Sequence, residues 1–270
     1  MIVVGLKARA TSSIAVVEME GPIGQRIKPH EYVKLLRGLE EDNHVKAVVL
    51  DIDSPGGSAT ASSYMHMAVK SLAAKKPVIS FISGVGASGA YMIAAPTTRI
   101  VAIPGGLIGS IGVISMRPQV QDAMERLGLR MHVTKSDQFK DMGSMFREAT
   151  PEELAKEQEL VDDLYDQFLD VVAEGRGIEK TRAREIATGE VYTARKCTEL
   201  GLVDELGDLE RAIDLAAELS DSPRRPVWTR PKRGLREVLS SMAATSFVDA
   251  FVTRLDERIY ASRYDVQHRL

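Results

Sequence analysis

The chain has 270 residues, of which 44% are hydrophobic and 27% charged, so it can bury a core in one large domain or two small ones. Its net charge of −3 gives nucleic acid no electrostatic reason to bind. The single cysteine excludes an internal disulfide framework and a CxxC metal site, and the five histidines are scattered along the sequence. If the protein is an enzyme, we expect its chemistry to depend on neither histidine, cysteine nor metal.

No targeting segment is expected in this sequence. Met1–Leu6 is apolar but too short for a signal peptide, and its basic residues follow it instead of preceding it. The uncharged run Pro77–Thr98 is long enough for a membrane span, but its glycines, proline and hydroxyl side chains favour a buried strand, a glycine turn and a buried helix. We therefore expect a cytoplasmic protein without a transmembrane helix, and association with a membrane stays open.

Strands and helices are expected to alternate through the first half of the chain. The predicted strands are Ile14–Glu20, Val45–Asp53, Pro77–Ser83, Arg99–Ile103, Ile111–Ser115 and Leu129–Thr134. The predicted helices are Glu31–Glu41, a helix from its Ser58 N-cap to about Ala74, Ala87–Ala95 and Val120–Leu127. This alternation predicts an α/β fold with parallel strands and right-handed crossovers.

The pattern becomes helical after residue 150. Thr150–Glu153 combines a capping box with a proline at the first helical position, which predicts a helix to about Glu174. Shorter helices are predicted at Lys180–Ala187, Ala194–Leu200 and Leu209–Leu219. We expect one domain over residues 1–220 and a tail over residues 221–270, in which a basic linker precedes an amphipathic helix. That helix either packs on a neighbouring subunit or rests on an anionic membrane surface.

The densest motif is the stretch Ser83–Tyr91, SGVGASGAY. Its glycines spell GxGxxG, but no acidic residue follows before Gln121 to bind a ribose, which argues against a dinucleotide site. The same stretch places Ser88 at a strand-to-helix turn that resembles a nucleophile elbow, where the Gly89 amide could stabilise an oxyanion. A Ser-His-Asp triad with a downstream histidine, and a serine that only fills a tight turn, stay open as alternatives.

Two further features bear on this motif. Asp53–Gly57 follows a strand, and its consecutive glycines can point amides at an anion or a peptide carbonyl. Lys140 is flanked by apolar side chains, and burial of that kind is the usual way to bring a lysine toward the pKa of about 7–8 that a general base needs. The neighbouring Asp141 works against this, unless its carboxylate points to the opposite side.

Together these motifs resemble the signal peptide peptidase A family of serine–lysine peptidases, over roughly residues 14–219. The matching segments are Asp53–Gly57, Gly86–Tyr91, Gly109–Val113, Lys140–Met142, Arg147–Glu148, Gly189–Arg195 and Leu202–Leu206. They occur in the family's order and with plausible spacing.

The resemblance implies a fold like that of Clp protease and crotonase, a superhelix of stacked parallel strands and helices with a mainly helical C-terminal portion. It implies that Ser88 is the nucleophile and Lys140 the general base, and that Ser110 orients the lysine amine. Gly57 and Gly89 would supply the oxyanion-hole amides. The reaction would pass through an acyl-enzyme and would need no cofactor, neither metal nor nucleotide.

The resemblance also implies peptide substrates and a homo-oligomer. Family substrates are signal-peptide remnants and other unfolded or apolar peptides, and single-length members form rings whose active sites are shared between subunits. Bacterial members usually begin with a membrane anchor, and we expect none in this chain. Two alternatives stay open, a crotonase-like acyl-CoA enzyme with an acidic base and a non-catalytic scaffold of the same fold.

Overall fold

The computed structural model describes residues 13–231, and the chain's contacts divide it after Arg230. The expected amphipathic helix of the tail lies outside the described residues. The strands are β1 (Ser13–Glu20), β2 (Val45–Ser54), β3 (Val78–Ala87), β4 (Arg99–Ala102), β5 (Leu107–Gly109), β6 (Val191–Thr193), β7 (Glu205–Leu206) and β8 (Pro226–Thr229). The helices are α1 (Pro29–Glu41), α2 (Ala59–Ala73), α3 (Gly89–Ala94), α4 (Gln121–Arg126), α5 (Pro151–Arg176), α6 (Lys180–Ile186), α7 (Ala194–Glu199) and α8 (Leu209–Ser220).

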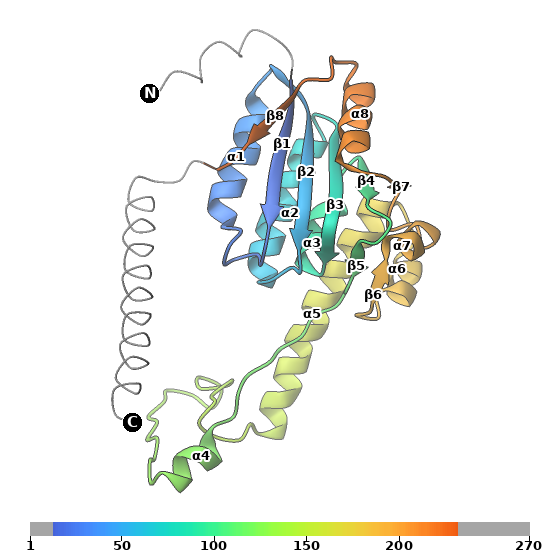
Figure 1. Ribbon diagram of the computed structural model, residues 1–270. Helices are drawn as coiled ribbons and strands as arrows, with labels where there is room; N and C mark the ends of the chain where they lie inside the picture. Colours follow the sequence, from blue (N-terminus) through green and yellow to red (C-terminus); the bar gives the residue numbers. More distant parts are fainter. Residues whose placement is uncertain (1–12, 232–270) are drawn as a thin grey trace, which may run out of the picture. The chain divides into compact units, whose positions relative to one another are not determined.

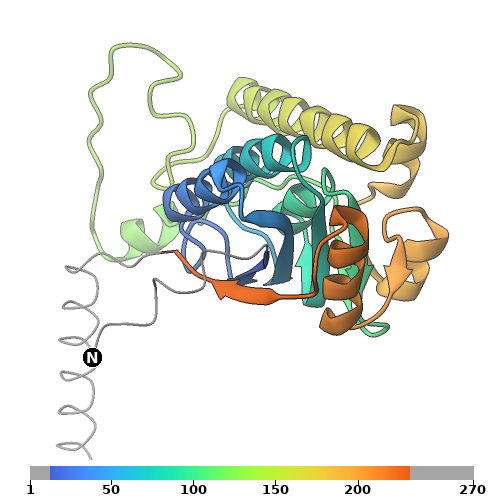
Figure 2. The same ribbon diagram turned by 90° about the horizontal axis from the view of Figure 1, so that it is seen from above.

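The strands form one sheet in the order β6-β5-β3-β2-β1-β8, with β4 paired to β3 and β7 paired to β4 (Figure 1). Every pairing is parallel except that of β5 with β6. The sheet carries an apolar core on each face, because α1 and α2 cover one side and α8 covers the other (Figure 2). Burial on both faces explains why β1 to β3 are almost continuously apolar in sequence. The expected α/β fold with parallel strands is confirmed.

The uncharged run Pro77–Thr98 becomes β3 and α3 inside this core, which confirms the predicted strand and helix, although Gly84 and Gly86 continue β3 instead of forming a separate turn. Tyr91, within that run, is fully buried and donates a hydrogen bond from its hydroxyl to the Leu202 carbonyl at 2.9 Å. Among the helices of residues 13–231, none combines the length and apolarity that a bilayer span requires.

Two predicted strands are wrong. Neither Ile111–Ser115 nor Leu129–Thr134 is a strand in the structure, and the strand in this region is instead β5. Both segments contain alternating β-formers, but the apolar side chains of the second one are exposed and no neighbouring strand pairs with it. Strand propensity mainly reflects packing against neighbours, so a segment without neighbours does not realise it.

Besides β5, three strands were not expected from the sequence: the short strands β6 and β7, and β8. β8 pairs in parallel with β1, and Val227 lies opposite Ala15 in the register. Residues 226–229 therefore belong to the sheet, although the basic composition around them predicted a linker. The strand follows α8 and returns the chain along the outer edge of β1 (Figure 1).

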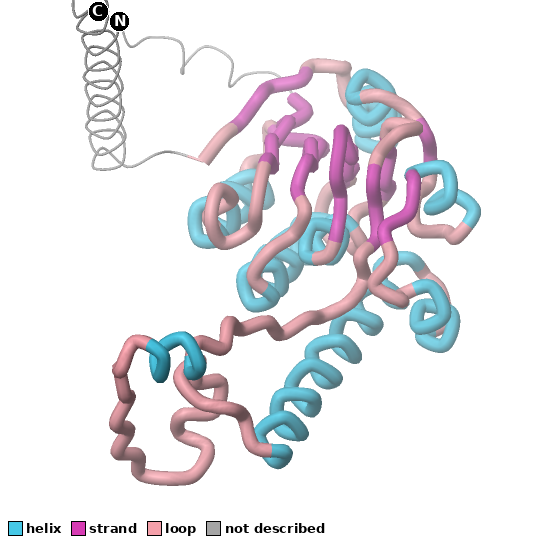
Figure 3. Tube along the Cα trace, turned by 60° about the horizontal axis from the view of Figure 1, so that its bottom comes forward, coloured by secondary structure: helices cyan, strands magenta, loops and turns pink. Residues whose placement is uncertain are grey.

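Residues 112–150, which we call the arm, leave the sheet after β5 and return to the start of α5 (Figure 3). Apart from α4 the arm has no regular secondary structure. The Val120 amide donates to the Met145 carbonyl at 2.8 Å, which joins its outgoing and returning halves. Several large apolar side chains of the arm are exposed. They are Ile114, Met116, Leu127, Leu129, Met131, Val133, Phe139 and Phe146.

The long helix α5 connects the arm to the core. Its N-terminus is closed by a complete capping box between Thr150 and Glu153, as the sequence predicted. In its C-terminal half, Phe168, Leu169 and Val172 are buried in the main core. The helix ends at Gly177, whose left-handed φ of 62° is typical of a C-terminal glycine.

Candidate active site

Ser88 stands at the junction of β3 and α3, where the backbone is strained. Its φ of 53° and ψ of −123° lie outside the regions that side chains with a Cβ normally adopt. The Ser88 amide donates to the Gly109 carbonyl of β5 at 2.8 Å, which fixes this turn to the neighbouring strand. A half-buried serine on a strained strand-to-helix turn has the geometry of a nucleophile elbow, and such strain tends to persist where function requires it.

Close packing behind the turn requires small residues. A Cβ on Gly89 would lie 2.0 Å from the Ser62 hydroxyl oxygen of α2, so only glycine fits there. α3 can therefore pack against α2, and its first residue directly follows Ser88 (Figure 1). Glycine at this position also leaves the Gly89 amide unobstructed by a side chain of its own.

The second glycine turn, after β2, lies against the serine turn. A Cβ on Gly56 would lie 2.7 Å from the Gly89 nitrogen and 2.9 Å from Ser88 Cβ. Gly57 bridges to Ile23, whose amide donates to the Gly56 carbonyl at 2.8 Å. Within residues 13–231 the amides of Gly57 and Gly89 donate no hydrogen bond to a protein acceptor, so both are available to an oxyanion.

These turns border a cleft with a volume of about 690 Å³. One wall comes from the glycine turn, Ser88 and the segment after β5, and the opposite wall comes from α5 and the residues after α6. The lining residues are Pro55, Gly57, Ser88, Ser110, Gly112, Val113, Ile114, Val161, Asp162, Tyr165, Ala187, Thr188 and Gly189. The predicted residues Ser88, Gly57 and Ser110 therefore share one cleft, and Gly89 directly follows the serine.

Ser110 is the first residue after β5 and has a left-handed φ of 47°. Its amide donates to the Glu190 carbonyl at 2.6 Å, and the preceding residue, Gly109, accepts the hydrogen bond from Ser88. The two serines are thus held by the same short strand. This arrangement can keep the Ser110 hydroxyl at a fixed place in the cleft.

Lys140 is not brought to Ser88 within the single chain. It lies on the arm, is exposed, and is absent from the lining of the cleft. The Asp141 carboxylate forms ion pairs with Lys135 at 2.6 Å and with Arg147 at 2.8 Å. Hydrogen bonds from Arg147 and Lys135 hold the pKa of Asp141 well below its usual range. In the part of the chain that the structure describes, Lys140 has no carboxylate partner of its own.

The cleft contains two functional groups that the sequence analysis missed. Asp162 lines it from α5 and accepts a hydrogen bond from the Gln158 amide at 2.7 Å. Tyr165, one turn further along, donates from its hydroxyl to the Ala187 carbonyl at 2.6 Å and so joins α5 to the residues after α6. Neither residue belongs to a recognisable motif, and no sequence signal placed α5 opposite Ser88.

Histidine and thiol chemistry find no support in the described structure. No histidine or cysteine among residues 13–231 lines the cleft, and His132 is exposed on the arm, outside any strand. Burial lowers the pKa of His66 and raises the pKa of the Cys197 thiol to about 12. Over the same residues, no group of three or more acidic, histidine or cysteine side chains is arranged to hold a metal ion.

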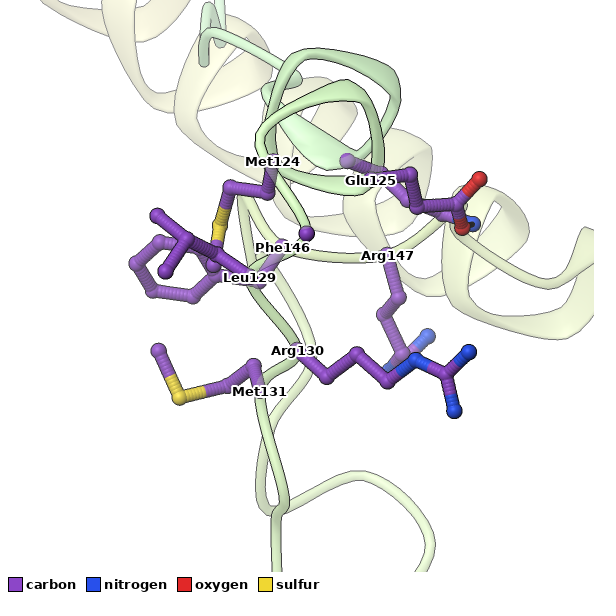
Figure 4. Close-up of a pocket in the computed structure, with 9 residues that line it drawn as sticks. Met124, Glu125, Leu129, Arg130, Met131, Phe146 and Arg147 are labelled. Atoms are coloured by element: carbon purple, nitrogen blue, oxygen red, sulfur yellow. Dashed lines mark hydrogen bonds between the residues drawn. The ribbon is translucent and has the colours of Figure 1, made fainter.

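A second pocket of about 730 Å³ lies within the arm (Figure 4). Met124, Leu129, Met131 and Phe146 form its apolar side, and the charged side chains lie opposite. None of the predicted site residues lines it. We therefore place the candidate active site in the cleft beside Ser88, where the strained serine and the two available amides occur together.

Profiles of two known protein families match this chain. The profile described as Peptidase family S49 matches residues 70–222, which includes Ser88, Ser110 and the arm. The chain belongs to peptidase family S49. A Clp protease profile matches residues 9–105, which covers the first strands of the sheet and the turn at Ser88. The expected enzyme class, a peptidase, is confirmed at the level of the family.

The names of similar proteins agree with the resemblance inferred from the motifs. A putative protease of Synechocystis is 36% identical over 214 residues, which cover 79% of this chain and 76% of the relative. A putative protease of Methanocaldococcus jannaschii is 38% identical over 190 residues, 70% of this chain and 61% of the relative. The chloroplastic serine protease SPPA of Arabidopsis thaliana is 32% identical over 246 residues, 88% of this chain but only 36% of that longer protein.

Solved structures with the same fold come from the membrane-bound stomatin-specific protease 1510-N. Its serine-to-alanine mutant aligns with a TM-score of 0.55 at 16% identity, over 83% of this chain and all of that one. Its lysine-to-alanine mutant in complex with a substrate peptide aligns with a TM-score of 0.56 at 18% identity, over 87% of this chain and 98% of that one. The expected Clp protease-like fold is thereby confirmed.

Proposed function

We propose that this S49 chain is a serine endopeptidase in which Ser88 is the nucleophile and Lys140 the general base. The observation that carries the proposal is the strained backbone of Ser88, held on a strand-to-helix turn beside a cleft. Membership of a peptidase family supports a peptide bond as the target of this serine. A serine mutant and a lysine mutant of one protease among the solved structures of this fold agree with a serine–lysine pair.

The reaction has two balanced steps. First, Ser88 Oγ bonds to the carbonyl carbon of the peptide and gives its proton to the neutral amine of Lys140; the C–N bond breaks, and the leaving amine takes that proton. Second, a water oxygen bonds to the acyl carbon and passes a proton to the lysine. The bond to Ser88 Oγ then breaks, and the serine recovers the proton. The lysine ends neutral, and no cofactor is consumed.

The remaining site residues stabilise charge and geometry. Each step creates a negative oxygen on the substrate, and the amides of Gly57 and Gly89 have no protein acceptor that would compete for it. The hydroxyl of Ser110 would accept a hydrogen bond from the Lys140 amine and so aim its lone pair at Ser88. Ser110 can do this because β5 holds it next to the carbonyl that fixes the serine turn.

We propose that the lysine reaches the serine from a neighbouring copy of the chain. In one chain Lys140 is exposed on the arm, whereas the serine lies in a cleft that the lysine does not line. The arm exposes eight large apolar side chains, more than an isolated surface segment normally carries, and such surfaces mark contacts between proteins. A ring of copies, each arm reaching its neighbour's cleft, would bury these side chains and complete each site.

Subunit mixing tests this assembly. Ser88→Ala and Lys140→Ala chains are each expected to be inactive, but co-refolded mixtures should regain part of the wild-type rate, because some sites then pair an intact serine with an intact lysine. Rates of peptide cleavage by the mixture and by each variant alone decide the result. Mixtures as inactive as the single variants would place both groups in the same chain.

The contact between the two glycine turns gives a second prediction. Gly56 has a φ of 90°, and a Cβ there would strike the Gly89 amide. Gly56→Ala is therefore expected to displace the serine turn, to lower kcat at least tenfold and to destabilise the fold by about 1–3 kcal/mol. Gly105→Ala is the matched control, since a Cβ there meets nothing within 4 Å. Equal kcat and thermal stability in both variants would contradict the proposed role of this turn.

The cleft favours apolar, extended peptides such as signal-peptide remnants or unfolded segments. Val113, Ile114 and Val161 line it with apolar surface, and Asp162 supplies its one carboxylate. Because this carboxylate could serve as a base, a crotonase-like acyl-CoA enzyme with an acidic base is the second candidate function.

Turnover of two substrate classes separates these functions. The full chain is expected to cleave an internally quenched apolar peptide and to leave acyl-CoA thioesters intact. Thioester turnover without peptide cleavage would favour the acyl-CoA enzyme. Turnover of neither substrate by the intact oligomer would favour a scaffold of the same fold.

A further inference from the structure

The arm segment that carries Lys140 is fixed by a network of charges at the start of α5. The guanidinium of Arg147 donates to both oxygens of Asp141, from Nε at 2.9 Å and from Nη2 at 2.8 Å. It also donates to both oxygens of Glu153, with Nη1 at 2.8 Å from Oε2. Arg147 therefore joins two carboxylates through paired hydrogen bonds, the strongest geometry that an arginine offers.

One end of this network is anchored in the helix. Glu153 is only 3% exposed, and its carboxylate also accepts from the Thr150 amide at 2.9 Å in the capping box. Hydrogen bonds from Arg147 and the Thr150 amide lower the pKa of Glu153 to about 2, so it stays charged at neutral pH. Because α5 continues into the core at Phe168, the network ties the arm to the rigid part of the protein.

The other end closes the loop before Lys140. The Lys135 amine donates to the Asp141 carboxylate at 2.6 Å and to the Gln138 carbonyl at 2.9 Å. The Lys140 amide donates to the Asp137 carbonyl at 3.2 Å. Lys140 is thus the last residue of a closed loop, directly before the carboxylate that Arg147 holds.

We infer that Arg147 is a positioning residue for Lys140, holding the Asp141 carboxylate against α5 so that the adjacent lysine keeps a fixed place and gains no acidic partner. This inference rests on the proposed role of Lys140. Its chemical reason is that a paired lysine stays protonated. Lys180 illustrates the effect in this chain, because hydrogen bonds from its ammonium group to Asp166 and Asp170 raise its pKa.

Loss of Arg147 would free the Asp141 carboxylate. The charged groups that face this carboxylate are Lys135 and Arg147, with Glu153 beyond the arginine. Without the arginine, one carboxylate oxygen can turn to the neighbouring Lys140. A general base acts in its neutral form, so a lysine with an acidic partner becomes active only at higher pH.

The test compares kcat, KM and pH profiles for cleavage of a quenched apolar peptide by wild type and variants. Arg147→Gln is expected to lower kcat at least tenfold with KM within twofold, and to move the rise of kcat/KM to higher pH by about one unit. Adding Asp141→Asn to Arg147→Gln should return that rise to the wild-type pH, and Arg147→Lys should recover part of kcat.

Lys156→Gln is the matched control, because it removes an exposed ion pair between Lys156 of α5 and Glu159 that does not touch the network. It should behave as wild type.

Two outcomes would overturn the inference. The first is an Arg147→Gln chain with wild-type kcat. The second is a lower kcat whose pH dependence does not move and that Arg147→Lys does not improve, which would indicate a structural role alone. If circular dichroism shows that Arg147→Gln does not fold, the variants Arg147→Lys and Asp141→Asn replace it. Each of them is expected to lower kcat, and an unchanged kcat in both would contradict the inference. A Lys140→Ala variant tests the role of Lys140 as the base separately from the positioning role of Arg147. Full activity of Lys140→Ala would show that Lys140 is not the base.

Discussion

Ser88→Ala is expected to reduce peptide cleavage at least about a thousandfold. The oxyanion amides and the cleft remain in this variant, but no oxygen is left to form the acyl-enzyme. Alanine keeps the Cβ and therefore the strained backbone, so the fold and the assembly should not change. Initial rates on a quenched apolar peptide measure the loss, and size-exclusion chromatography checks the assembly.

A matched control is Ser71→Ala, which removes an exposed hydroxyl on α2 that only contacts Glu40 at 3.2 Å. Its cleavage rate should equal that of wild type. If Ser88→Ala keeps more than a tenth of the wild-type rate, Ser88 is not the nucleophile, and the strain at this turn has another cause.

Lys140→Ala is expected to lower kcat about a hundredfold to ten-thousandfold, the range that general-base catalysis supplies. Lys140→Arg is the sharper variant, because it keeps the positive charge but a guanidinium cannot give up its proton in a protein. Both variants should therefore be inactive, while Lys156→Ala, on the exposed side of α5, should retain full activity. The same peptide assay measures all three.

An active Lys140→Arg chain would contradict a base and would indicate that only the positive charge matters. In that case Asp162 becomes the leading candidate for proton transfer, since its carboxylate lines the cleft. Asp162→Asn should have little effect on kcat if the serine–lysine assignment holds.

Much of the first half of the fold could be predicted from sequence, because its main strands are buried on both faces and read as apolar runs. β2 and α2 are examples, since an apolar run, a glycine turn and the Ser58 cap define them locally. Apart from α4, the arm could not be predicted in this way. Leu129–Thr134 has the composition of a strand, but its conformation depends on partners that the segment itself does not encode.

The same distinction between local and distant determinants applies to the candidate site. Ser88 and Gly57 follow predicted strands, so local strand-and-turn motifs singled them out, whereas Ser110, after the unpredicted strand β5, was named only through the family resemblance. The GxGxxG pattern there has a packing reason instead of a nucleotide one. A Cβ on Gly84 would meet the Asp53 carboxylate at 2.5 Å, whose oxygen already accepts from the Val85 amide.

Residues supplied by distant elements escaped prediction. Asp162 and Tyr165 reach the cleft only because α5 packs its far end into the core, and nothing near Ser88 in sequence encodes that placement. The pairing of Asp141 with Arg147 likewise depends on how the arm meets α5. It bears on the question that the sequence left open, since the Asp141 carboxylate is paired with Arg147 and Lys135.

The most direct test of the serine–lysine assignment is covalent labelling of the intact oligomer with a serine-reactive phosphonate, followed by peptide mapping. We predict a single adduct on Ser88 in the wild-type protein, and labelling slowed at least about a hundredfold in Lys140→Ala, because the hydroxyl then has no base. An adduct on another residue, or equal labelling rates in the two proteins, would contradict the account.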